Sequence, residues 1–317
     1  MNEEPLDIET EIAALDLLDH QGIDWKRVQR TAYLIHQHLR YEYPGPIYDL
    51  KQRLMIIPPA IHGDQRLIVH RLEVSTSPVE ISSLHDDFEN PVLNLYIPQV
   101  EKAIDFEVWI VIERHADSGP HYGPITWLSD PRFLEPSPLT KPNDLLQKVA
   151  AMLSSEDRQG IALAQRVNDW VYHALQYEHK VTDIHTTAAQ ALALGQGVCQ
   201  DYAHVMIALC RLCGLPARYV SGHMLGEGGT HAWVEVLVPA ADRTNEAVAL
   251  PFDPTHGCEA SLSYLTVAVG RDYYDVAPTS GTFRASYRGQ LSTNKRVGLT
   301  GLKYTDTTTE VPPTIGC

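Results

Sequence analysis

The sequence predicts an α+β protein in which an all-β, sandwich-like domain precedes a core of helices followed by antiparallel strands. Three observations support this fold class. Apolar residues recur with period two up to about residue 114, at helical spacing after about residue 156, and with period two again after about residue 217. Prolines and glycines accumulate over residues 117–143, which is typical of a connection between domains.

The patterns divide the chain into four segments. We expect a helical extension over 1–30, a β-rich domain over 31–130, the α+β core over 140–275, and a tail over 276–317 with a possible β-hairpin near 287–302. In the extension, Ile8, Ile12, Leu15 and Leu18 have helical spacing and predict a helix over 7–19.

Short period-two runs dominate the second segment. The clearest places Phe106, Val108, Ile110 and Ile112 on one face of a half-buried strand. Similar runs lie at 33–43, 66–75 and 92–97, and turn-forming residues separate them at 44–46, 62–64 and 86–87. An antiparallel sandwich or barrel is therefore expected.

The third segment begins with helices. Ala164, Val167, Val171 and Ala174 predict a helix over 156–178. A second helix is expected from 186 or 187 to 194, before Gly195, and a third over 199–214. Strand-like runs then follow at 217–224, 231–238 and 247–252.

Composition excludes several classes of protein. A formal net charge of −15 argues against a nucleic-acid partner, because such binding depends on Lys and Arg. The acidic N-terminus lacks the pattern of a secretory signal, and no apolar run reaches the roughly 18 residues of a membrane span. We therefore expect a cytoplasmic protein without a membrane partner. Its five cysteines do not form a disulfide framework, and neither a metal nor a cofactor is predicted. The oligomeric state stays open.

Cys199 stands where a glycine-containing turn, Gly195-Gln-Gly-Val, becomes a helix. Unpaired N–H groups and the helix dipole favour negative charge there, so ionisation to the nucleophilic thiolate is eased. The same N–H groups can accept an oxyanion. Alone, this position is equally consistent with a small buried cysteine.

A histidine and an aspartate complete a candidate triad. His231 begins a strand after the glycine-rich stretch 226–229, and Asp253 ends the next strand. In an antiparallel hairpin these two positions are neighbours, so Asp253 can orient His231 as the general base for Cys199. A strand histidine and a turn-forming aspartate are the alternatives for each residue alone, but the ordered combination favours catalysis.

These residues resemble the bacterial transglutaminase-like proteins, whose catalytic Cys, His and Asp fall on Cys199, His231 and Asp253. The resemblance is dense over about 163–275 and is carried by residues 197–204, 215–222, 231–236, 252–255 and 269–273. Residues 31–114 resemble, more weakly, the β-rich region that accompanies this domain. Glu89 departs from the family, which usually has glycine there; this concerns the tightness of a turn rather than the chemistry.

The resemblance implies a papain-like fold and an acyl-enzyme mechanism. The Cys199 thiolate attacks an amide carbonyl, His231 transfers the proton and Asp253 holds the imidazole. The backbone N–H of Cys199 is one expected oxyanion donor. Trp170 is a candidate for the second, although its helical stripe favours a core position. Gln200 and Asp201, in the first turn of the helix, are candidate substrate-binding residues.

Other residues with reactive side chains favour structural roles. Cys210 and Cys213 form an isolated C-x-x-C in an apolar helix, which is typical of buried positions rather than a zinc or redox site. His204 lies about 140° around the helix from Cys199, so a structural hydrogen bond is expected. Asp86, Asp87 and Glu89 predict a solvated turn, because they lack the spacing of a calcium loop.

The leading functional hypothesis is a cysteine peptidase or amidase that acts on a peptide or protein amide, since water is always available to resolve an acyl-enzyme. A protein-glutamine transglutaminase is the alternative within enzymes. A non-catalytic binding module on the same fold is the alternative from another class, and it requires an inert thiol at Cys199.

Overall fold

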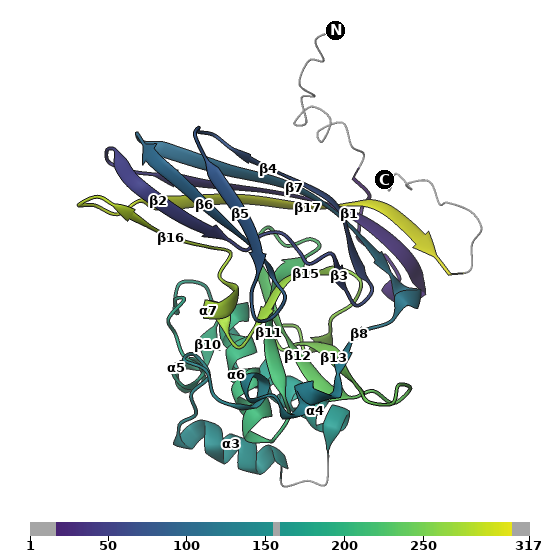
Figure 1. The fold of residues 1–317 in the computed structure, drawn as a ribbon. Helices are drawn as coiled ribbons and strands as arrows, with labels where there is room; N and C mark the ends of the chain where they lie inside the picture. The colour runs from purple at the N-terminus through teal and green to yellow at the C-terminus, as the bar shows by residue number, and fades with distance from the viewer. Residues whose placement is uncertain (1–16, 155–158, 306–317) are drawn as a thin grey trace.

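A β-sandwich and a mixed core stand one above the other in Figure 1. The computed structural model describes residues 17–154 and 159–305. The helix predicted over 7–19 falls almost entirely outside this part of the chain. Within the described residues, no helix has the length and apolar character needed to cross a membrane.

The sandwich consists of a five-stranded and a four-stranded antiparallel sheet. The five-stranded sheet contains, in order, β17 (Gln290–Tyr304), β1 (Val28–Glu42), β7 (Ala103–His115), β4 (Gln65–Val74) and β3 (Ile61–His62). The four-stranded sheet contains β16 (Thr279–Arg284), β2 (Ile47–Leu54), β6 (Pro91–Val100) and β5 (Glu80–His85). The predicted all-β, sandwich-like domain is therefore present.

Alternating burial along the strands forms the sandwich core. Phe106, Val108, Ile110 and Ile112 on β7 are fully buried, as their period-two pattern predicts. They pack with buried residues of both sheets, including Leu50 on β2. Burial of such aliphatic and aromatic side chains contributes about 1.5–3 kcal/mol each relative to exposure.

The C-terminal segment does not form the hairpin considered near 287–302. Strand β16 pairs with β2, whereas β17 pairs with β1 from Glu42↔Gln290 to Val28↔Tyr304, so the two strands enter different sheets. Each strand pairs with residues more than 200 positions earlier in the chain. Local turn chemistry could not indicate a pairing of this kind.

The core contains an antiparallel sheet and helices. The sheet runs β14 (Cys258–Glu259), β13 (Glu246–Asp253), β12 (His231–Pro239), β11 (Ala217–Met224) and β15 (Tyr264–Gly270), and β8 (His121–Pro124) also pairs with β13. The α-helices are α2 (Pro131–Leu134), α3 (Asp144–Ser154), α4 (Gly160–Ala174), α5 (Ala188–Leu194), α6 (Cys199–Leu212) and α7 (Tyr273–Val276). Short 3-10 helices are η1 (Trp25–Arg27), η2 (Ala116–Ser118) and η3 (Ile125–Ser129). A parallel pair joins β9 (Gln176–Tyr177) to β10 (Gln196–Gly197).

Helices followed by antiparallel strands were expected here, and the elements differ from that expectation in detail. Helix α4 is shorter than the predicted 156–178, and α3 is an additional helix that directly follows the proline-rich region. Strand β8 also lies in the region expected to be a plain connection. Helix α6 is buried from Asp201 to Arg211 between the sheet and the other helices, which gives the site a rigid base.

Polar side chains of the sandwich bind backbone groups of β15. Asn90 bonds both the N–H and the carbonyl of Val269 at 2.8 and 2.7 Å. Gln65 makes the same two-sided contact with Thr266 at 2.9 and 2.8 Å. These buried amide contacts fix the sandwich against the strand that carries Tyr264 at its start.

Candidate active site

Cys199 is the first residue of α6, as the sequence predicts. Helix α5 ends at Gly195, whose φ of +68° is the left-handed conformation that favours glycine, and the chain then turns into α6. Asp201 holds this turn from behind, since its carboxylate accepts from the N–H of Val198 and the hydroxyl of Thr182 at 2.8 and 2.7 Å. Cys199 itself is partly exposed.

His231 begins β12 and lies opposite Gly222 on β11. A Cβ at Gly222 would stand 2.1 Å from the carbonyl oxygen of Leu265 and 2.5 Å from the ring of Trp233. Glycine is therefore needed for Trp233 to pack beside the His231 ring, which it stacks at a centroid distance of 6.2 Å. The stack and the strand together hold the imidazole in place.

Asp253 ends β13 and bonds His231. The distance from His231 Nε2 to Asp253 Oδ2 is 2.8 Å, and the two side chains are 2% and 0% exposed. The prediction that these residues are neighbours is confirmed. The Cys199 side chain also hydrogen-bonds the His231 ring. Because Asp253 occupies Nε2, Nδ1 is the nitrogen that remains for the thiol.

Three further residues of this site were missed by sequence reasoning. Tyr264 donates its hydroxyl to Asp253 Oδ2 at 2.7 Å, and His256 Nδ1 lies 2.7 Å from the same oxygen. Glu227 reaches His231 Nδ1 at 3.2 Å and His256 Nε2 at 3.8 Å. Two imidazoles and two carboxylates thus form a closed ring of contacts. Only His256, three residues after Asp253 in an aspartate turn, had a local signal.

The ring shifts the proton affinities of its members. Burial alone lowers the pKa of His231, but Asp253, followed by Cys199 and Glu227, raises it to about 12. Burial raises the pKa of Asp253, yet the hydrogen bonds from His231 and His256 hold it below its usual range. The bond to His231 lowers the pKa of Glu227, and the bond to Asp253 raises that of His256. At neutral pH the geometry therefore favours an imidazolium between carboxylates.

The candidate oxyanion and substrate-binding residues lie in different surroundings. Trp170 is partly buried and packs against the apolar core, as its helical stripe favours. Asp201 is buried and serves the turn before α6, so its substrate-binding prediction is corrected. Gln200 points to the carbonyl of Asp183 at 3.4 Å. The backbone N–H of Cys199 stays a predicted oxyanion donor.

The residues expected to be structural lie in the core. His204 is buried, burial lowers its pKa to about 3, and its Nε2 accepts from the N–H of Tyr273. Burial raises the pKa of the Cys210 and Cys213 thiols, which keeps both in the unreactive form. Asp86 closes its turn by accepting from the N–H groups of Phe88 and Asn90, both at 2.9 Å.

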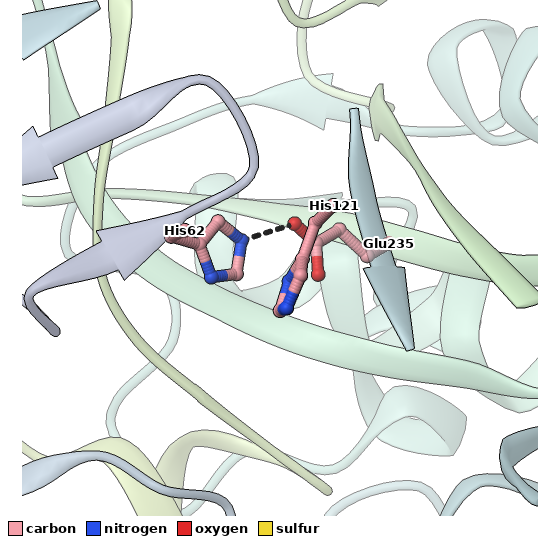
Figure 2. Close-up of side chains that lie close together, drawn as sticks. All are labelled: His62, His121 and Glu235. Atoms are coloured by element: carbon pink, nitrogen blue, oxygen red, sulfur yellow. Dashed lines mark hydrogen bonds and ion pairs between the residues drawn. The ribbon is translucent and has the colours of Figure 1, made fainter. Parts of the chain in front are cut away.

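A second cluster of ligand-type side chains lies between the sandwich and the core. Figure 2 shows His62, His121 and Glu235, with the hydrogen bond from His62 Nε2 to Glu235 Oε1, which measures 2.8 Å. Their ligand atoms lie within 4.8 Å of one another, as they would at a metal site. The chemistry of the donors decides whether a cation fits.

Arg218 completes this cluster. Its guanidinium bonds Glu235 Oε2 at 2.6 and 2.7 Å and donates to His121 Nδ1 at 2.9 Å. His121 must therefore carry its proton on Nε2, so the nitrogen left for a metal is protonated. A buried guanidinium beside it also opposes a dication. The donor set does not fit a metal, and the cluster is a buried ion network between the two parts of the protein.

The family of the chain follows from this fold and from comparison with known proteins. Residues 147–245 match the model of the transglutaminase-like superfamily, and residues 33–113 match that of the bacterial transglutaminase-like N-terminal region. The first match contains Cys199 and His231, and the second covers the sandwich strands β2 to β6. The chain therefore has a transglutaminase-like core preceded by a bacterial transglutaminase-like N-terminal region.

Several known proteins are similar to most of this chain in sequence or in structure. An uncharacterized protein of Mycobacterium leprae is 29% identical over 83% of this chain and 95% of its own length. One from Mycobacterium tuberculosis is 28% identical over 68% of this chain and 76% of its own. A crystal structure from Cytophaga hutchinsonii, described as a putative cysteine protease, has a TM-score of 0.67 at 22% identity and covers 90% of this chain and 94% of its own. The last comparison supports the fold.

Proposed function

We propose that this protein is a cysteine-nucleophile acyl-transfer enzyme, and that it acts as a peptidase or amidase on a peptide or protein amide. One observation carries the proposal. His231 bonds Asp253 through Nε2 at 2.8 Å and turns its other nitrogen toward Cys199 at a helix start. Nucleophile, base and orienting carboxylate thus meet in one array, in which only the nucleophile is partly exposed.

The proposed reaction has two steps. The Cys199 sulfur attacks the amide carbon while the backbone N–H of Cys199 stabilises the oxyanion, and the His231 imidazolium gives its Nδ1 proton to the leaving nitrogen. The C–N bond breaks and a thioester remains on Cys199. Water then attacks this thioester and His231 takes its proton; the C–S bond breaks, the acid product leaves, and the pair of Cys199 thiolate and His231 imidazolium is restored.

The ionic state of the site supports this sequence. Asp253 holds His231 as an imidazolium at neutral pH, which is the form that protonates a leaving amine. Trp233 and Tyr264 pack around the ring and keep bulk water from its Asp253 side. Apart from the attacking water, each step uses only residues of the chain.

A glutamine-containing peptide incubated with a labelled primary amine tests the proposal. We expect the wild type to release acid or cleaved peptide, and we expect the Cys199→Ser variant to release neither. Incorporation of the label would instead assign a protein-glutamine transglutaminase. Products no greater than those of Cys199→Ser, across a peptide library, would contradict the enzymatic proposal and favour a binding module.

A further inference from the structure

Glu227 lies on the loop that connects β11 to β12 and leads directly to His231. The loop reads Leu225-Gly-Glu-Gly-Gly-Thr230, and Gly226 has a φ of +92°, a conformation that favours glycine. The N–H of Glu227 bonds the carbonyl of Met224 at 3.1 Å. This turn aims the carboxylate back over the catalytic histidine.

Glu227 is the solvent-accessible acid of the closed ring. Its side chain is 37% exposed, whereas those of His231 and Asp253 are almost completely buried. Tyr177, which is also exposed, interacts electrostatically with Cys199, Glu227 and His231. The Glu227 carboxylate is therefore accessible to a substrate that binds at Cys199.

The contact of Glu227 with His231 has a chemical consequence. His231 Nδ1 carries a single proton, and Glu227 Oε2 stands 3.2 Å from it. The Cys199 sulfur and the leaving nitrogen of a substrate need that same proton. A substrate must therefore draw Glu227 away from His231, and a positively charged group is the partner that does so most favourably.

We propose that Glu227 binds a cationic group of the substrate, a lysine- or arginine-type side chain on the leaving-group side of the amide. When the substrate binds, the Glu227 carboxylate leaves the His231 ring and pairs with the substrate cation. The Nδ1 proton of His231 is then available for the reaction. The leaving-group side is assigned because His231 Nδ1 is the atom that meets the leaving nitrogen. This inference rests on the proposed function, and it names the substrate class.

Charged thiol reagents test the inference without a known substrate. Cys199 is modified with methyl methanethiosulfonate, which is neutral, and with its 2-(trimethylammonium)ethyl analogue, which is cationic, and peptide mass mapping gives the rate at Cys199. The quantity compared is the ratio of the cationic to the neutral rate. Glu259→Gln is the matched control, because it removes the same charge from β14, which pairs with the end of β13 that carries Asp253.

We expect Glu227→Gln to lower this ratio about tenfold, and Glu259→Gln to lower it less than about twofold. A ratio that is unchanged in Glu227→Gln, or equally lowered by both substitutions, would overturn the inference. The neutral reagent separates this result from the proposed function itself. If the wild type and His231→Ala react with the neutral reagent at equal rates, the proposal that His231 activates Cys199 is contradicted. That conclusion does not depend on the ratio of the cationic to the neutral rate.

Discussion

Tyr264 of β15 donates its hydroxyl to Asp253 Oδ2 at 2.7 Å, on the same oxygen that holds His231. Arg114 of the sandwich binds the carbonyls of Ser261 and Tyr264 and is itself paired with Asp64. The β-rich domain thus helps to fix the loop that supports the Asp253 carboxylate.

Tyr264→Phe removes one donor from this buried carboxylate. A hydrogen bond to a charged group contributes about 1.5–3 kcal/mol, so we expect a loss of that size in the free energy of unfolding. Urea denaturation measures it. Tyr122→Phe, which loses an exposed contact with Asp242 at 3.1 Å, is the control and should change stability by less than about 0.5 kcal/mol. Equal losses would argue against a special role for Tyr264.

The His231–Asp253 pair predicts how stability depends on pH. His231 has its pKa raised to about 12, so its contribution is complete below the unfolded value of about 6.5 and is lost as pH rises toward 12. Asp253 has a lowered pKa, so its contribution is present above about pH 4 and is lost on acidification. The stability difference between wild type and His231→Gln should therefore be larger at pH 5 than at pH 9. Urea unfolding at both values checks this, and the reverse order would refute it.

Removal of His62 is expected to weaken the contact between the sandwich and the core. His62→Ala leaves a buried oxygen of Glu235 without its donor, at a cost of about 1–3 kcal/mol in stability. The exposed His70 on β4 supplies the control, since His70→Ala should be nearly neutral. Thermal unfolding measures both proteins. Equimolar Zn²⁺ should leave the melting temperature of the wild type unchanged, and a rise that His62→Ala abolishes would instead indicate a metal site.

Glu89 adopts a φ of +64° in the turn between β5 and β6. This left-handed conformation costs a residue with a Cβ roughly 1–2 kcal/mol. Glycine avoids that cost, but it also raises the conformational entropy of the unfolded chain, which cancels part of the gain in stability. We expect Glu89→Gly to raise the free energy of unfolding by up to about 1 kcal/mol. Asp87→Gly, at a neighbouring position without positive φ, should lower it. A destabilised Glu89→Gly protein would show that the turn tolerates the side chain without strain.

The sequence was most informative where chemistry coincides with a local signal. Cys199 follows a glycine turn, and His231 and Asp253 lie at the start and end of consecutive strands, so antiparallel pairing alone makes the latter two neighbours. Helix α5 likewise has its cap at Thr187 and its end at Gly195, both readable from residue type.

The missed features depend on contacts between distant positions. Glu227 stands in a glycine-rich loop without periodicity, and its direction is set only when β11 and β12 pair. His62 meets Glu235 across 173 residues, and β17 returns to β1 from the far end of the chain. Residue patterns determine which face of an element is buried, but not which distant element covers it.

The rate of Cys199 alkylation by iodoacetamide at neutral pH reports directly on the proposed nucleophile. We expect Cys199 to react much faster than Cys210 and Cys213, whose thiol pKa values are raised by burial. We also expect His231→Ala to slow the reaction of Cys199 by about tenfold or more, because the imidazolium partner is lost. Equal rates at the three cysteines, together with no effect of His231→Ala, would contradict an activated nucleophile at this site.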